Sequence, residues 1–383
     1  MDKSCNLPDE RHRVTGRSSM NLSGVRQSLK ELSQQRILIL DGAMGTSLQA
    51  MQLEESDFRG EVLLHHPFPL LGNYDVLNLS NPHLVKQVHQ SYVSAGADLI
   101  TTNTFNSNVL SQERYGLENQ VAELNYRGAR LAREMADACT TRKVWVVGSM
   151  GPTPVPLSLI ARTTSEDSSL ATPSEDFSAA TSSCSDSRLS QRLEEAFNRM
   201  VAAYEVQAKG LLDGGADLLL LETCYDVMNA QAALTAIRRL EQERMSAILV
   251  MVSVTINPNG CTFTGQTLNE IYARVSEFPI FSFGINCSFG IDGLEPYLKQ
   301  LSDALPCLIS CHPNAGFPDE QGVYAMTPSY MAECMRAFAV KGYLNIAGGC
   351  CGTTAAHITA MAEALQDVEP HKISFTEYSN SQF

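Results

Sequence analysis

The sequence is poor in charge and lacks the long apolar runs of membrane proteins. Only 18% of its 383 residues are charged, whereas 44% are hydrophobic. No apolar run reaches the roughly 18 residues that a transmembrane helix needs, and the polar amino-terminal residues lack the apolar core of a signal peptide. The composition is typical of a soluble globular protein with a large core.

Positive charge is scarcer still, because 28 Lys and Arg residues face 42 Asp and Glu residues, for a formal net charge of −14. A protein of that sign repels the phosphates of nucleic acids and of anionic lipids. We therefore expect neither nucleic acid nor a membrane as a partner. The charge alone says nothing about the substrate.

Disulfides are not expected either. Eleven cysteines in a chain of this length are too sparse for a disulfide scaffold, and a reducing compartment would keep them as thiols. We expect the protein to be cytoplasmic.

Eight short apolar segments alternate with helical patterns along the chain. Each segment is continuously apolar, as expected for parallel strands that are covered on both sides. Eight such βα units favour a closed (β/α)8 barrel, the TIM-barrel class of α/β proteins, over an open sheet. The predicted strands are Ile37–Leu40, Asp98–Phe105, Val144–Ser149, Leu218–Thr223, Ile248–Thr255, Phe281–Asn286, Cys307–Ser310 and Leu344–Ala347.

Three segments fall outside this alternation. Residues 1–35 are expected to form a disordered arm and a short helix, and the barrel is expected to span 36–367. Ser and Thr dominate 162–190, which predicts a flexible insertion after the third strand. Residues 368–383 are expected to form a tail.

Three cysteines follow two of the predicted strands. Cys287 follows the sixth, and Cys350 and Cys351 follow the eighth within a glycine frame. Three thiolates at strand ends, with one tetrahedral position left open, are expected of a catalytic zinc site. The alternatives are buried cysteines that act as small hydrophobes, or a vicinal disulfide between Cys350 and Cys351.

Two further motifs lie at strand ends. The turn Asp41-Gly42-Ala43-Met44-Gly45-Thr46 could hold a carboxylate on its backbone amides, although a plain tight turn explains it equally well. Glu222 follows four leucines, where an unpaired carboxylate is costly. A substrate ammonium would pair with Glu222, and a salt bridge to Lys or Arg is the alternative.

Together these motifs resemble the zinc-dependent homocysteine S-methyltransferases, from about Arg36 to Leu365. The closest likeness within that family is to the N-terminal homocysteine-binding module of cobalamin-dependent methionine synthase. The matching motifs are Asp41–Thr46, Thr102–Phe105, Gly151–Thr153, Glu222-Thr223, Gly284–Cys287 and Gly348–Gly352.

The resemblance implies a (β/α)8 barrel in which Cys287, Cys350 and Cys351 bind Zn²⁺. It implies that homocysteine is held by Asp41, Gly42, Ala43, Met44, Gly45, Asn103, Glu222 and Asn286. The expected reaction is methyl transfer to homocysteine, giving methionine, with methylcobalamin as donor from a separate folate- and cobalamin-binding carrier.

Two other functions remain open. A betaine- or S-methylmethionine-dependent methyltransferase would keep the zinc site and change only the donor. A non-catalytic homocysteine- or zinc-binding subunit of a larger synthase would keep the site without the reaction.

Overall fold

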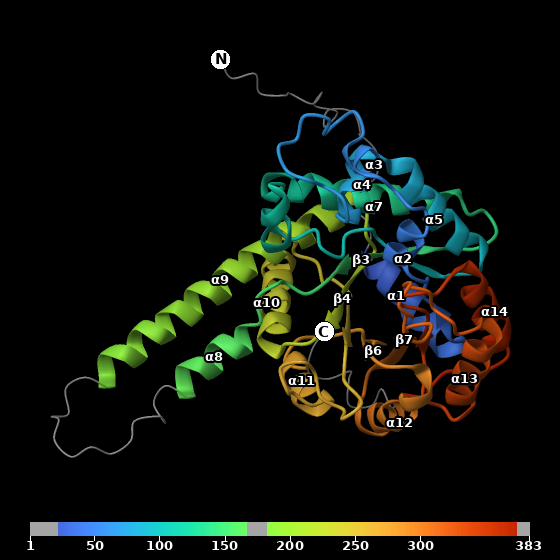
Figure 1. Ribbon diagram of the computed structural model, residues 1–383. Helices are drawn as coiled ribbons and strands as arrows, with labels where there is room; N and C mark the ends of the chain where they lie inside the picture. The colour runs from blue at the N-terminus through green and yellow to red at the C-terminus, as the bar shows by residue number, and fades with distance from the viewer. Residues whose placement is uncertain (1–21, 167–181, 374–383) are drawn as a thin grey trace.

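Eight parallel strands surround a common axis, with helices outside them, in the computed structural model, which describes residues 22–166 and 182–373 (Figure 1). The strand order is β1-β8-β7-β6-β5-β4-β3-β2, and a parallel bridge between Leu40 and Leu99 connects β1 to β2. The predicted (β/α)8 barrel is therefore confirmed. The strands are β1 Leu38–Ile39, β2 Leu99–Thr101, β3 Trp145–Met150, β4 Leu218–Cys224, β5 Val250–Val254, β6 Ser282–Cys287, β7 Leu308–Pro313 and β8 Ile346–Ala347.

Helices follow the strands and cover the outside of the barrel, while α1 lies beside the strands' amino-terminal ends. The α-helices are α1 Leu22–Gln35, α2 Met44–Gln49, α3 Glu55–Arg59, α4 Leu77–Ser80, α5 Pro82–Ser94, α6 Val109–Gln112, α7 Val121–Ala138, α8 Leu157–Glu166, α9 Ser182–Gly214, α10 Val227–Arg244, α11 Leu268–Val275, α12 Glu295–Ala304, α13 Pro328–Val340 and α14 Ala355–Leu365. None of the helices in the described ranges is long and apolar enough to span a bilayer.

Apolar side chains fill the barrel from its amino-terminal end. Val25 and Leu29 of α1 pack with inward-facing strand residues such as Leu38, Trp145 and Met251 in one cluster. A second, larger cluster fills the layer between the strands and the outer helices. Because the carboxyl ends of the strands carry polar residues instead, they form the open end of the barrel, which we call the mouth.

The tripeptide Gly-Ala-Asp occurs before β2 and again before β4, and it has the same structural role in both places. Asp98 and Asp217 each follow a Gly-Ala pair and accept a backbone hydrogen bond from the preceding strand, from Ile39 N–H at 2.9 Å and Val146 N–H at 2.8 Å. Each also pairs with an arginine, Arg36 or Arg133. The repeat is therefore a structural tie between successive βα units rather than part of the site.

A pair of helices extends away from the barrel after β3. The carboxyl-terminal part of α9 buries Met200, Tyr204 and Leu211, whereas its amino-terminal part projects outward beside α8 (Figure 1). The predicted insertion 162–190 overlaps both helices, since α8 runs to Glu166 and α9 begins at Ser182. Residues 1–21 of the predicted arm, 167–181 of the insertion and 374–383 of the tail lie outside the described residues.

A buried carboxylate fixes the loop that follows β2. Asp75 is 3% exposed, and its Oδ1 accepts hydrogen bonds from Asn106 N–H at 3.0 Å and Ser107 Oγ at 2.8 Å. Burial raises the pKa of Asp75 from 3.8 to about 6. Because the folded-state pKa lies above the unfolded-state value, the stability that Asp75 contributes is complete below about pH 4 and is lost as the pH rises through about 6.

We expect Asp75→Asn to stabilise the protein at alkaline pH. Both hydrogen bonds end on Oδ1, which asparagine retains, while the ionised form is no longer buried. Urea unfolding should show a gain of about 1–3 kcal/mol at pH 8 relative to the wild type, about 1 kcal/mol larger than the gain at pH 5. A difference between the two proteins that does not change with pH would contradict this assignment.

Candidate metal centre and substrate site

The three predicted cysteine ligands meet at the mouth of the barrel. Cys287 Sγ at the end of β6 lies 2.7 Å from Cys350 Sγ and 4.0 Å from Cys351 Sγ, both after β8. All three sulfurs lie within 4.8 Å of one another. Among the described residues they form the one group of at least three His, Cys, Asp or Glu side chains able to share a metal ion.

Unusual backbone conformations produce this convergence. Cys287 and Ser288 both have positive φ, at 51° and 60°, which turns the chain sharply at the end of β6. After β8, Gly352 has a φ of 78°, and a Cβ there would lie 2.1 Å from the ring of Tyr324. Glycine is thus required at 352 both by the turn and by the tyrosine packed over it.

The thiols share their protons. Hydrogen bonds from Cys287 and Cys350 lower the pKa of Cys351 to about 3. The contacts with Cys287 and Cys351, together with burial, raise the pKa of Cys350. The contact with Cys350 lowers the pKa of Cys287, but the contact with Cys351 and burial raise it by more. The three thiols therefore titrate as one coupled group, in which more than one negative charge is unfavourable. Further deprotonation requires a compensating positive charge.

This donor set suits a soft divalent metal ion. Thiolate sulfur is a preferred ligand of zinc, and three protein ligands leave a fourth position for substrate. Asn314 belongs to the same region, since its Nδ2 donates to Ser288 O at 3.4 Å while its buried Oδ1 has no hydrogen-bond partner. The next residue, Ala315, donates its N–H to Cys351 O at 2.9 Å, so a buried oxygen without a donor on this loop fits a site for a cation.

The glycine-rich turn after β1 packs directly against the cysteine loop. Ala43 N–H donates to Thr353 Oγ1 at 3.1 Å, and Gly352 N–H donates to Thr46 Oγ1 at 3.1 Å. A Cβ at Gly42 would lie 2.8 Å from Thr353 Oγ1, which explains the glycine by close packing. The turn therefore lies next to the thiols. It includes the first residues of α2, whose backbone N–H groups have no hydrogen-bond acceptor within the helix.

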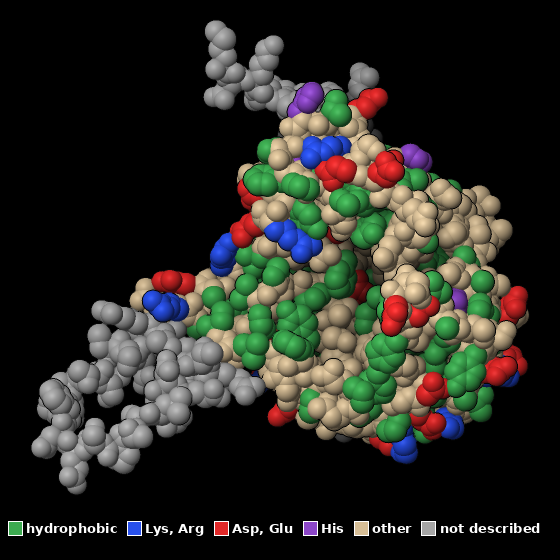
Figure 2. Space-filling view, viewed as in Figure 1, with side chains coloured by type: hydrophobic (Ala, Val, Ile, Leu, Met, Phe, Trp, Pro, Cys, Tyr) green, Lys and Arg blue, Asp and Glu red, His purple; other side chains and the backbone are tan. Residues whose placement is uncertain are grey.

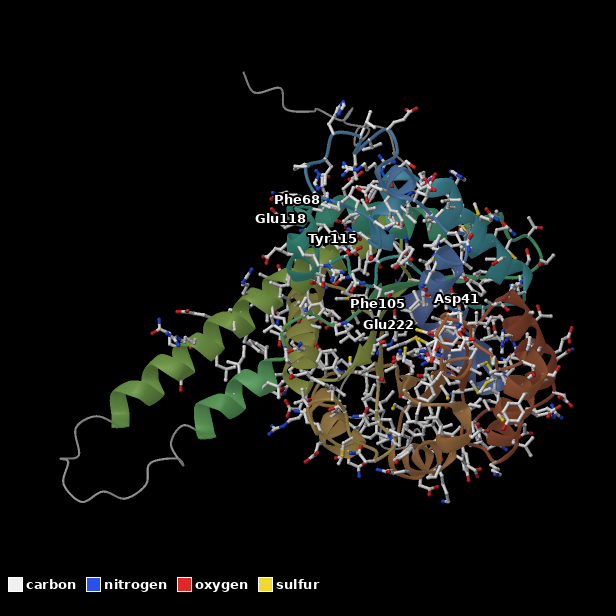
Figure 3. The ribbon with its side chains drawn as sticks, in the orientation of Figure 1. Asp41, Phe68, Phe105, Tyr115, Glu118 and Glu222 are labelled. Atoms are coloured by element: carbon white, nitrogen blue, oxygen red, sulfur yellow. The ribbon has the colours of Figure 1, made fainter. Side chains whose placement is uncertain are left out.

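Two carboxylates, one buried and one half-buried, complete the base of the mouth. Figure 2 shows a hollow on this face with acidic atoms inside it, and Figure 3 places Asp41 and Glu222 near its centre. Part of Glu222 remains accessible to solvent. Burial of its carboxyl group nevertheless raises the pKa to about 7. The hydrogen bond from Ser149 Oγ opposes this rise, and the negative charge of Cys351 adds to it. No salt bridge to Glu222 is found among the described residues, so its ion-pair alternative is not realised there.

Asp41 is already bound within the protein. Its two carboxylate oxygens accept hydrogen bonds from Thr101 N–H at 2.8 Å and Thr101 Oγ1 at 3.0 Å. Burial raises the pKa of Asp41 well above its usual value, and nearby Glu222 adds to this effect. Of the two acids, Glu222 is the more available to a ligand.

Two predicted substrate contacts are largely occupied by protein partners. Asn103 donates to Tyr74 O at 2.8 Å and to Asn78 Oδ1 at 3.2 Å, which leaves only its own Oδ1 for a ligand. Asn286 is fully buried and lies beside the cysteines, from where it contacts Thr223, Ser253 and Cys350. The sequence analysis assigned no role in the site to four residues whose contacts lie on other strands or loops. They are Ser149, Thr223, Ser253 and Tyr324.

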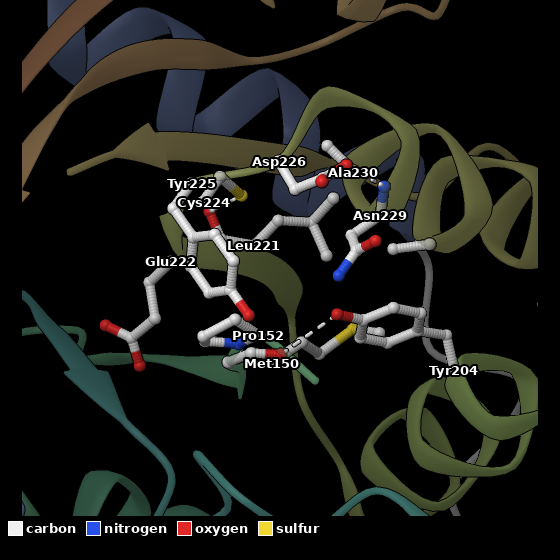
Figure 4. Close-up of a pocket in the computed structure, with 12 residues that line it drawn as sticks. Met150, Pro152, Tyr204, Leu221, Glu222, Cys224, Tyr225, Asp226, Asn229 and Ala230 are labelled. Atoms are coloured by element: carbon white, nitrogen blue, oxygen red, sulfur yellow. Dashed lines mark hydrogen bonds between the residues drawn. The ribbon is translucent and has the colours of Figure 1, made fainter. Parts of the chain in front are cut away.

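A small hollow of about 10 Å³ lies beside Glu222, between the end of β4 and helices α9 and α10. Figure 4 shows the Glu222 carboxylate pointing away from Tyr204, whose hydroxyl donates to Gly151 O at 3.1 Å. Asp226 anchors α8 on the same side by accepting from Ser158 N–H and Oγ, both at 2.9 Å. This region supports the mouth and leaves Glu222 directed to the opposite side.

Comparison with known proteins agrees with this architecture. Two solved structures of the homocysteine methyltransferase MmuM from Escherichia coli share the fold. The metallated form is 23% identical, with a TM-score of 0.61 over 87% of this chain and 98% of that chain. The oxidised form is 24% identical, with the same TM-score over 87% and 97% of the two chains. Residues 38–365 match the family described as homocysteine S-methyltransferase, and the chain accordingly belongs to this family of methyltransferases that act on homocysteine.

Proposed function

We propose that this protein transfers a methyl group to the sulfur of L-homocysteine, giving L-methionine, at a zinc ion held by Cys287, Cys350 and Cys351. The observation that carries the proposal is the convergence of the three sulfurs within 4.8 Å at the mouth. Bound there, Zn²⁺ supplies the positive charge that keeps a substrate thiol deprotonated at neutral pH. Three negative ligands keep that sulfur electron-rich.

The protein holds the rest of the substrate at two points. We assign the ammonium group to Glu222, because burial without a cationic partner leaves this carboxylate in need of one. We assign the carboxylate to the amides of Gly42, Met44 and Gly45 in the turn that packs against the cysteine loop, because the amide of Ala43 is already bound to Thr353. Binding at both ends orients the sulfur toward the incoming methyl group. The sulfur–carbon bond forms as the donor's bond to methyl breaks, and the thiol proton leaves to solvent.

For the donor we propose methylcobalamin, presented by a separate folate- and cobalamin-binding carrier, as the resemblance to methionine synthase implies. We place the reaction in the cytoplasm, since all nine cysteines of the described residues are free thiols and the ligands must stay reduced. Betaine and S-methylmethionine are the alternative donors.

The experiment that tests this function measures zinc and methionine in parallel. Purified, reduced protein should contain about one zinc per chain, the stoichiometry of a single three-cysteine site. It should form methionine from homocysteine with methylcobalamin, but not with betaine or S-methylmethionine. Methionine from one of the other two donors would refute methylcobalamin while keeping the site. Zinc and homocysteine binding without methionine from any donor would identify a non-catalytic subunit.

A further inference from the structure

The side chain of Asn286 is surrounded by hydrogen-bond partners from three other strand ends. Its Oδ1 accepts from Thr223 N–H at 2.9 Å, after β4 leaves regular pairing, and from Ser253 Oγ of β5 at 2.7 Å. Its Nδ2 donates to Thr223 Oγ1 at 2.8 Å and faces Cys350 Sγ, after β8, at 3.8 Å. One amide on β6 therefore connects the ends of β4, β5 and β8.

These partners fix the orientation of the amide and occupy all of its hydrogen-bonding positions. A backbone N–H can only donate, so the atom facing Thr223 N must be the oxygen. An amide side chain offers two donors and two acceptor positions, and all four are taken. Since Asn286 is also fully buried, nothing remains for a substrate, and the predicted role of Asn286 as a substrate contact gives way to a different one.

Thr223 is held in a conformation that its own side chain disfavours. Its φ is 58°, in the left-handed region that β-branched residues rarely enter. The pairing of β4 with β5 shifts between Leu221 and Cys224, so Thr223 lies within an irregularity of the strand. Irregularities of this kind redirect neighbouring side chains next to active sites. Here the neighbour is Glu222.

We propose that Asn286 is a positioning residue that sets where Glu222 lies relative to the metal ligand Cys350. Its two bonds to Thr223 hold the strained turn that directs Glu222, while its Nδ2 faces the sulfur of Cys350. The distance between ammonium site and metal site is thereby fixed by one rigid amide. This inference rests on the proposed function, in which Glu222 binds the ammonium group and Cys350 binds zinc.

The test combines Asn286→Ala with Thr223→Gly on zinc-loaded, reduced protein, with the homocysteine dissociation constant measured by calorimetry. Asn286→Ala should weaken homocysteine binding about 10- to 100-fold, the usual cost of losing a group that orients a metal site. Glycine adopts a positive φ without strain. In the Thr223→Gly background the same asparagine substitution should therefore weaken binding less than tenfold.

Asn345→Ala is the matched control. Asn345 is equally buried but lies before β8, at the opposite end of the barrel, where it bonds Ile309 N–H and His371 O. It should lower stability and leave homocysteine affinity unchanged. Wild-type affinity in Asn286→Ala, or an equal loss in both Thr223 backgrounds, would overturn the positioning role. A wild-type protein that binds zinc but no homocysteine would instead refute the proposed function.

Discussion

Cys350→Ser is expected to lose zinc and methyl transfer together. Serine is isosteric with cysteine, but its hydroxyl stays protonated at neutral pH and is a poor ligand for a site built from thiolates. Two remaining thiolates and a neutral hydroxyl hold a divalent ion far less tightly. After dialysis against a weak chelator, the zinc content should fall from about one per chain to nearly none. The rate of methionine formation should fall at least about 1,000-fold, since the substrate thiol then remains protonated.

The control for this prediction uses cysteines outside the cluster. Cys139 follows α7 and Cys334 lies within α13, and neither belongs to the group of three convergent sulfurs. Cys139→Ser and Cys334→Ser should keep both zinc and activity. Circular dichroism should show that Cys350→Ser retains its helices. Full activity of metal-free Cys350→Ser would refute the zinc-dependent reaction.

The sequence was sufficient to predict the barrel because its signals are local. Each strand is a short apolar run between glycine-rich turns and amphipathic helices, and eight of them define the topology by the rules of βα units. Cys287, Cys350 and Cys351 were predicted for the same reason, since the carboxyl ends of parallel strands share one end of a barrel. The thiols at the ends of β6 and β8 do converge there.

Contacts between residues on distant strands could not be predicted from the sequence. Thr223 gives no local sign of a positive φ, because the conformation is stabilised by Asn286, 63 residues further along the chain. From the sequence, the glycine-rich turn was equally compatible with a carboxylate-binding site and with a plain tight turn. The structure explains Gly42 by the close approach of Thr353 and Tyr92, which lie 311 and 50 residues further along the chain. Nothing in the composition of either segment specifies such pairings.

Glu222→Gln is expected to cause the largest loss of homocysteine affinity among substitutions that keep the metal ligands intact. The glutamine has the same shape and can still bond Ser149 Oγ, but it cannot form an ion pair with the substrate ammonium in this desolvated position. Breaking a buried ion pair by neutralising one partner costs about 3–5 kcal/mol. We therefore expect the dissociation constant to rise by about 150- to 5,000-fold. Zinc content should remain at about one per chain, because Glu222 is not among the three metal ligands.

A truncated ligand separates the ammonium contact from a general disturbance of the mouth. 4-Mercaptobutanoate is homocysteine without its amino group, and it keeps both the thiol and the carboxylate. If Glu222 binds the ammonium group, the wild type should bind this analogue much more weakly than homocysteine, and Glu222→Gln should bind it at least as well as the wild type does. Removing the charge from the protein and removing it from the ligand would then have overlapping effects, as expected for two halves of one interaction. If the substitution weakened both ligands by the same factor, Glu222 would act on the shape of the site, and the ammonium group would have to bind elsewhere.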